Sequence, residues 1–114
     1  MVKNEDREFL FIVGPGHGFP AYQANILIEG SLSKYFPEKI PFSKKGFSEV
    51  IRNFSTPYGY PSHLNPEAPG VIAEGGELGY SLAIGAGSVL DNPDLITGVI
   101  IGDGEAETGP LASS

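Results

Sequence analysis

Apolar residues along the chain form two short continuous runs and three segments with helical spacing. The runs at residues 9 to 13 and 95 to 101 consist largely of β-branched, aromatic or leucine residues and each ends at a glycine. They predict two strands of a parallel sheet, of which the first is buried. Helical spacing extends from Pro20 to Pro37 and from residue 77 to 90, and a shorter helix fits residues 47 to 54. Strands that alternate with helices predict an α/β fold containing part of a parallel sheet.

Glycine and proline divide these segments. Residues 57 to 70 are too rich in proline for regular structure. Ligands of a parallel sheet bind at the carboxyl ends of its strands, so we expect the glycine loops at residues 14 to 18 and 102 to 104 to lie on one edge. The helix expected at residues 77 to 90 can lie very close to a neighbour, because much of its surface is small: Gly79, Ser81, Ala83, Gly85, Ala86 and Gly87.

The charge balance narrows the range of partners. The chain has 7 Lys and Arg against 14 Asp and Glu, a net charge of -7, and no basic patch, so no nucleic acid partner is expected. An acidic chain that binds phosphorylated metabolites needs a metal ion or backbone N–H groups to supply positive potential. The absence of cysteine excludes disulfides and mildly favours the cytoplasm. A charged N-terminus and the lack of a long apolar run argue against a signal peptide and a membrane span.

Two glycine-containing segments match known motifs only in part. Residues 14 to 18 follow a strand and precede a helix, but Phe19 stands where the dinucleotide-binding fingerprint has glycine. Residues 79 to 83 approximate the nucleophile elbow of serine hydrolases, but they lack its last glycine and the preceding strand. Neither a dinucleotide site nor a serine hydrolase is therefore favoured.

Asp103 directly follows the second predicted strand and is flanked by Gly102 and Gly104. We interpret Asp103 as an oxygen ligand for magnesium, with the flanking glycines allowing a diphosphate to come against the backbone. An ordinary Asp-Gly turn remains the alternative. A calcium loop fits poorly, because its sixth and twelfth positions hold Thr108 and Ser114 in place of glycine and glutamate.

The chain has two histidines, His17 in the first glycine loop and His63 in a proline-rich segment. Two histidines without cysteine argue against a structural zinc site and favour hydrogen bonding or proton transfer. A solvated loop histidine is the alternative in each case.

Four glycine-rich or histidine-containing segments follow one another along the chain: Gly14-Pro15-Gly16-His17-Gly18, Pro61-Ser62-His63-Leu64-Asn65-Pro66-Glu67, Glu74-Gly75-Gly76-Glu77-Leu78-Gly79-Tyr80-Ser81 and Gly102-Asp103-Gly104-Glu105-Ala106-Glu107-Thr108-Gly109-Pro110-Leu111-Ala112. In this order they resemble the phosphoketolases. Transketolases share only the Gly-His-Gly loop, the glycine-rich helix start and Gly-Asp-Gly, so the Glu-Ala-Glu-Thr-Gly continuation favours phosphoketolase. The resemblance covers residues 9 to 114, which we take as part of a thiamine diphosphate-binding domain, and leaves residues 1 to 8 as an N-terminal extension.

The resemblance implies an enzyme that uses thiamine diphosphate and Mg²⁺. With inorganic phosphate, such an enzyme splits xylulose 5-phosphate, fructose 6-phosphate or both into acetyl phosphate and an aldose phosphate. The family is expected to be cytoplasmic and to form a homodimer or higher oligomer. By this resemblance Asp103 binds the metal, and Gly104 and Glu105 approach the diphosphate. The Gly76 carbonyl holds the aminopyrimidine, while His17 and His63 face the substrate and its covalent adduct.

The resemblance also implies that part of the site lies outside this chain. The metal motif of the family continues with an asparagine that would fall beyond Ser114, and the carboxylate that activates the pyrimidine belongs to another domain. We therefore expect the chain alone to be inactive. With only part of a sheet, it should expose apolar edges and self-associate. A transketolase-like enzyme and a non-catalytic binding module derived from the cofactor domain remain alternatives.

Overall fold

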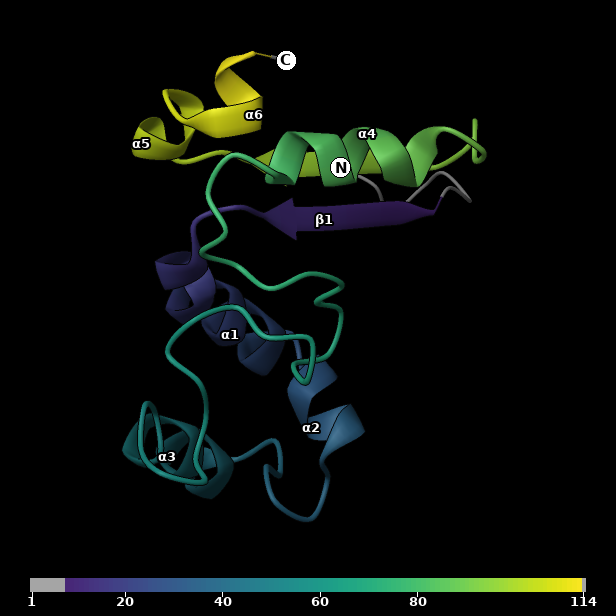
Figure 1. Cartoon of the computed structure of the whole chain (residues 1–114). Helices are drawn as coiled ribbons and strands as arrows, with labels where there is room; N and C mark the ends of the chain where they lie inside the picture. Colours follow the sequence, from purple (N-terminus) through teal and green to yellow (C-terminus); the bar gives the residue numbers. More distant parts are fainter. Residues whose placement is uncertain (1–7, 114) are drawn as a thin grey trace. The chain divides into compact units, whose positions relative to one another are not determined.

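The computed structural model of the chain describes residues 8 to 113, and these form two compact units (Figure 1). Unit 1 consists of the described residues up to Pro15 together with those from Gly75 onward. Unit 2 consists of residues 16 to 74. Each unit is described separately below. No helix in the described part of the chain is long and apolar enough to cross a membrane.

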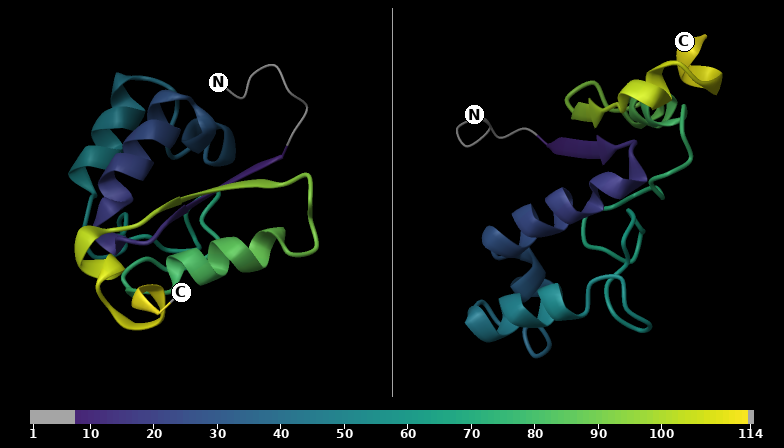
Figure 2. Two further views of the ribbon diagram at one scale, coloured as in Figure 1. Left: turned by 90° about the horizontal axis from the view of Figure 1, so that it is seen from above. Right: turned by 90° about the vertical axis from the view of Figure 1, so that its left-hand side faces the viewer.

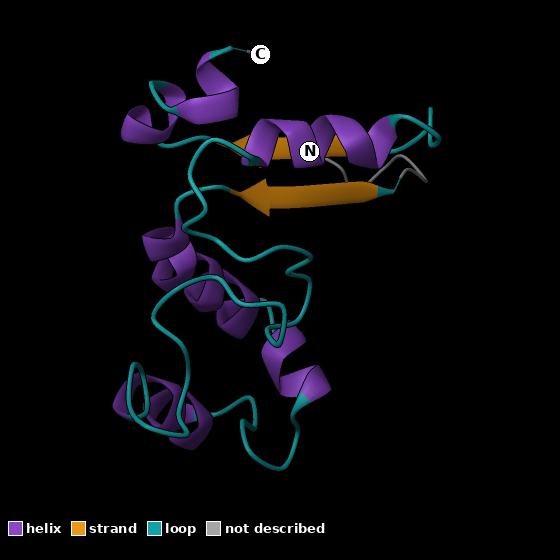
Figure 3. Cartoon of the chain, viewed as in Figure 1, coloured by secondary structure: helices purple, strands orange, loops and turns teal. Residues whose placement is uncertain are grey.

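Unit 1 contains the sheet, in which strands β1 (Phe9–Val13) and β2 (Ile96–Ile100) run parallel (Figure 3). Their register pairs Phe9 with Ile96 and Val13 with Ile100, and the N–H of Gly14 donates a further hydrogen bond of 2.9 Å to the carbonyl oxygen of Ile100. Both predicted strands and their parallel pairing are confirmed, which makes this an α/β chain. The loops that follow the two strands begin at the same edge, as expected.

Helix α4 (Ser81–Val89) packs along this sheet (Figure 2). A Cβ built on Gly85 would lie only 2.5 Å from Cγ2 of Val99, so the expected close approach of a small-residue helix is confirmed. The helix begins four residues later than predicted, because Gly79 has a φ of +95° that is incompatible with a right-handed helix.

The prediction that the first strand is buried is wrong for most of its residues. Among the residues of β1 and β2 only Ile12 is buried, whereas Phe9 and Phe11 are 47% and 40% exposed. Within unit 1, α4 covers the face that carries Ile12 and Val99, while Phe9 and Phe11 lie on the opposite face beside Gly98. The sheet thus exposes apolar side chains, as expected.

Two short helices after β2 were not predicted. Helices α5 (Asp103–Ala106) and α6 (Gly109–Ala112) have four residues each, too few for an apolar period to show in the sequence. Their glycines read as turn signals when the local sequence is considered alone.

Unit 2 is helical. A short 3₁₀ segment, η1 (Gly16–Gly18), leads into α1 (Phe19–Ile28), which is followed by α2 (Ser31–Tyr35) and α3 (Lys44–Arg52). The single helix predicted from Pro20 to Pro37 is therefore wrong. Gly30 adopts a φ of +92°, the left-handed conformation that commonly terminates a helix, and it separates α1 from α2.

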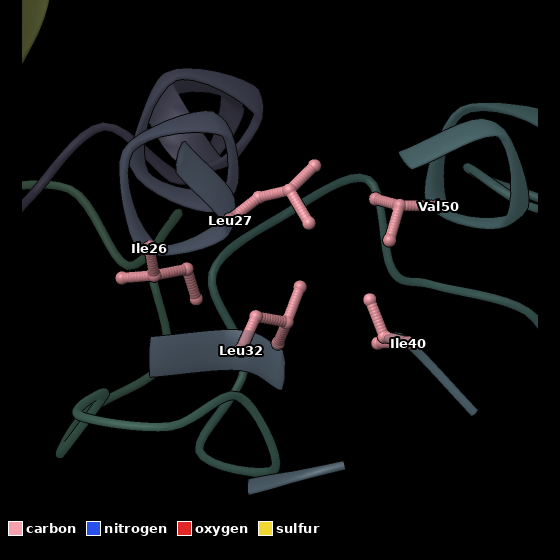
Figure 4. Close-up of a cluster of buried hydrophobic side chains, with 5 residues drawn as sticks. All are labelled: Ile26, Leu27, Leu32, Ile40 and Val50. Atoms are coloured by element: carbon pink, nitrogen blue, oxygen red, sulfur yellow. The ribbon is translucent and has the colours of Figure 1, made fainter. Parts of the chain in front are cut away.

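The core of unit 2 is formed by apolar side chains from α1, α2 and α3 and from the segment between α2 and α3. They point toward one another in Figure 4 and comprise Ile26, Leu27, Leu32, Ile40 and Val50. Helix α3 begins three residues before the predicted start, because Ser43 caps it by accepting a 3.4 Å hydrogen bond from the Gly46 N–H. The described stretch between Arg52 and Ser81 contains no helix or strand beyond one isolated bridge, which confirms the irregular segment expected there.

Candidate functional site

Glu105 is the most completely buried acidic residue of the described chain, with 1% of its surface exposed. Its Oε1 atom accepts hydrogen bonds from Ser81 Oγ at 2.6 Å and from the Gly79 N–H at 3.3 Å. Its Oε2 atom accepts a hydrogen bond from the Gly102 N–H at 3.1 Å. One carboxylate therefore joins the start of α4 to the start of α5.

The position of Glu105 in α5 explains how its side chain reaches Gly102. Glu105 is the third residue of the helix and Gly102 is its N-cap, so the contact is the glutamate half of a capping box. The other half is missing, because a glycine N-cap has no side chain to return a hydrogen bond. The contact with Gly102 uses only Oε2, so Oε1 can accept from Gly79 and Ser81.

The Glu105 carboxylate also lies directly against Gly14. A Cβ on Gly14 would overlap both carboxylate oxygens, so this position requires glycine. The carbonyl oxygen of Gly14 in turn accepts a 3.3 Å hydrogen bond from the Gly76 N–H. The loops that contain Gly14, Gly76 and Gly102 thus meet around one carboxylate at the carboxyl ends of β1 and β2.

These contacts favour the charged form of Glu105. Burial alone would raise the pKa of the carboxyl group, but hydrogen bonds from the Ser81 hydroxyl and from the backbone N–H groups of Gly102, Gly79 and Ser81 outweigh it. The net result is a pKa below the ordinary value for glutamate. Glu105 is therefore an ionised, hydrogen-bonded group inside unit 1.

Asp103 is exposed at the first position of α5, two residues before the buried Glu105. The neighbouring Gly104 is also exposed, and a Cβ on it would have no other heavy atom within 4 Å. The described residues contain no group of three or more His, Cys, Asp or Glu that could hold a metal ion, and the role of Asp103 as a metal ligand stays a prediction. An exposed carboxylate beside open backbone suits a metal-bound diphosphate.

Gly76 is exposed and has a φ of +107°, a conformation that favours glycine over residues with a Cβ. Its N–H is engaged with Gly14, as described above. The backbone geometry is compatible with a role for its carbonyl group, and that role stays a prediction.

The two histidines belong to unit 2, and both are exposed. His17 lies in η1, and Nδ1 of His63 lies 3.0 Å from Oγ of Ser62. The Leu64 N–H donates a 3.2 Å hydrogen bond to the carbonyl oxygen of Gly16. This bond joins the two histidine loops one residue away from each histidine.

The predicted site residues are thus distributed between the units. Unit 1 holds Gly76, Asp103, Gly104 and Glu105, and unit 2 holds the histidines. The inward direction of the Glu105 side chain was not predicted, nor were its partners Gly14, Gly79 and Ser81. The expected approach of Glu105 to a diphosphate stays a prediction, because protein donors occupy its carboxylate and only 1% of the residue is exposed.

Comparison with known proteins gives a consistent family assignment. A family model described as the XFP N-terminal domain matches residues 1 to 114. The chain is 51% identical over its whole length to probable phosphoketolases of Chlorobaculum tepidum and Schizosaccharomyces pombe, and 54% identical to one of Streptomyces avermitilis. In each case the chain spans 14% of the length of the relative.

Proposed function

The chain belongs to the XFP N-terminal domain family, and its relatives bear out the expected resemblance to phosphoketolases. We propose that it forms part of the cofactor site of a longer phosphoketolase. The observation that best supports this proposal is the meeting of the Gly76 and Gly102 loops with Gly14 around Glu105, at the carboxyl ends of parallel strands. Open α/β sheets bind their ligands at this edge.

The residues present suit thiamine diphosphate bound through Mg²⁺. The exposed Asp103 carboxylate would be one ligand of the metal, and the open backbone at Gly104 and the N–H of Glu105 would lie beside the diphosphate. The Gly76 carbonyl would hold the aminopyrimidine. When bound, thiamine diphosphate supplies the carbanion stabilisation that cleavage of a carbon–carbon bond requires.

His17 and His63 would bind the sugar substrate. Both side chains are exposed and lie in segments joined by the Leu64–Gly16 hydrogen bond, which would allow one substrate molecule to contact both. An imidazole can donate a hydrogen bond to a sugar oxygen and can pass a proton to a leaving hydroxyl. The overall reaction would convert xylulose 5-phosphate or fructose 6-phosphate, with inorganic phosphate, into acetyl phosphate and an aldose phosphate.

The intact enzyme is proposed to act in the cytoplasm as a homodimer or higher oligomer. Its partners would be a sugar phosphate and inorganic phosphate, with neither nucleic acid nor a membrane involved. The net charge of -7 supports the exclusion of nucleic acid.

Product analysis on the full-length enzyme that carries this chain tests the proposal. With thiamine diphosphate, Mg²⁺, inorganic phosphate and xylulose 5-phosphate or fructose 6-phosphate, we expect acetyl phosphate to form. A ketose formed by exchange onto an added aldose phosphate, without acetyl phosphate, would indicate a transketolase-like enzyme instead. The 114-residue chain alone is expected to form neither product.

A binding module derived from the cofactor domain would behave differently. It predicts a natural stop codon directly after Ser114, whereas a phosphoketolase predicts an open reading frame that continues through a second metal ligand, an asparagine. Reading the coding sequence beyond Ser114 therefore separates these two possibilities.

A further inference from the structure

Every oxygen of the Glu105 carboxylate is already occupied by protein donors. Oε1 accepts from Ser81 and Gly79, and Oε2 accepts from Gly102. With 1% of the residue exposed, no face of this carboxylate remains for a metal ion or a cofactor. The Glu105 carboxylate therefore binds groups of the protein and does not contact a ligand directly.

We propose that Glu105 is a positioning residue whose carboxylate sets where the Asp103 carboxylate and the Gly76 carbonyl lie. On one side it holds Gly102, the residue immediately before Asp103. On the other side it holds Gly79 and packs on Gly14, to which Gly76 is hydrogen bonded. The inference rests on the proposed function, because it concerns the same metal and cofactor site.

A carboxylate suits this position better than an amide. All the groups that contact its oxygens are donors, and a carboxylate accepts at both oxygens. In Glu105→Gln the amide NH₂ would face a donor, either at Gly102 or at Gly79 and Ser81. The hydrogen bonds at one of the two oxygen positions would be lost, while the size of the side chain is kept. Glu105→Gln therefore distinguishes the role of the carboxylate hydrogen bonds from that of the volume of the side chain.

The test is calorimetric titration of Mg²⁺ and of thiamine diphosphate into the full-length enzyme. Residues that orient metal ligands typically change metal affinity by about 10- to 100-fold, and we expect Glu105→Gln to weaken Mg²⁺ and thiamine diphosphate binding within that range. At saturating cofactor, the KM for the sugar phosphate should stay within about twofold of the parent, because any loss confined to cofactor binding is then overcome. Glu107→Gln, a change of an exposed acid two residues further on, is the matched control and should bind both as the parent does.

Ser81→Ala provides a second, milder variant. It removes the 2.6 Å hydrogen bond but leaves the carboxylate and its bond to Gly102, so a smaller loss of cofactor affinity is expected. If Glu105→Gln does not fold, Ser81→Ala decides the question. A lower unfolding temperature with unchanged affinity for Mg²⁺ and thiamine diphosphate would overturn the inference and reduce Glu105 to a structural role. A parent enzyme that binds no thiamine diphosphate would instead refute the proposed function, and the inference with it.

Discussion

The Leu64 N–H donates a 3.2 Å hydrogen bond to the carbonyl oxygen of Gly16, and this bond joins two loops that are far apart in the sequence. Each partner is the chain neighbour of a histidine, His63 in one loop and His17 in the other. Backbone hydrogen bonds of this kind fix the positions of the loops without using either imidazole. Both rings stay exposed, with Nδ1 of His63 lying 3.0 Å from Oγ of Ser62, and exposed imidazoles are what the proposed substrate role requires.

His63→Ala in the full-length enzyme is expected to reduce kcat while leaving cofactor binding nearly unchanged. General acid–base groups typically contribute about 10²- to 10⁴-fold to rate, and an exposed loop imidazole in unit 2 contributes little to the fold. Steady-state kinetics and titration of thiamine diphosphate measure the two effects. Ser62→Ala, which keeps the imidazole and removes only its 3.0 Å neighbour, is the control and should retain most of the turnover. Parent-like turnover in His63→Ala would remove the assignment.

Asp103→Asn is expected to weaken Mg²⁺ binding more than Glu105→Gln does. Loss of a direct carboxylate ligand should exceed the roughly 10- to 100-fold typical of residues that only orient ligands. The measurement is calorimetric titration of Mg²⁺ in the presence of thiamine diphosphate. Asp91→Asn changes another exposed aspartate at the end of α4 and should have no effect. The reverse order of the two variants would contradict the assignment of Asp103 as the ligand.

Two glycines of α4 should respond oppositely to alanine. At Gly85 a Cβ would lie 2.5 Å from Cγ2 of Val99, so Gly85→Ala should destabilise the contact with the sheet by about 1–3 kcal/mol. At Gly87 a Cβ would have nothing within 4 Å, so Gly87→Ala should stabilise the helix by about 0.5–1 kcal/mol. Hydrogen exchange of the β2 amides reports both changes as local opening free energies. Similar protection in the two variants would show that α4 does not pack on β2 through Gly85.

The isolated 114-residue chain is expected to self-associate as its concentration rises. Phe9 and Phe11 expose apolar surface on one face of a two-stranded sheet, and each strand leaves one edge without a partner within that sheet. Sedimentation velocity over a range of concentrations measures the association. Phe11→Lys, which places a charge on the exposed face, should reduce it. A single monomeric species at every concentration would contradict the expectation.

Local sequence predicted the elements whose signals are local. The two strands were recognisable as short apolar runs ending at glycine, and their observed bounds differ from the predicted ones by no more than one residue. The break between α1 and α2 was missed, because the apolar spacing continues past Gly30 and does not reveal its φ of +92°. The late start of α4 has the same cause at Gly79. Backbone conformation at single glycines was the information that the apolar pattern lacked.

The direction of the Glu105 side chain could not be predicted for a different reason. Asp103, Glu105 and Glu107 alternate in one short segment, and nothing in that segment shows which of the three carboxylates is buried. The distinction comes from Gly79 and Ser81, which lie 26 and 24 residues earlier in the chain and supply the donors that make burial of one carboxylate possible. Only the folded structure brings those donors to Glu105.

The pairing of Val13 with Ile100, continued by the Gly14–Ile100 hydrogen bond, has a consequence for how this chain tolerates changes in length. A residue inserted within β2 would advance everything after it by about 3.3 Å and turn every following side chain of the strand to the other face of the sheet. The Gly102 and Gly14 loops would then no longer meet around Glu105, although each loop kept its own sequence. An insertion in the irregular segment at residues 57 to 70 carries no such constraint from the sheet. Insertions and deletions should therefore be tolerated least within the strands and better in the irregular segment.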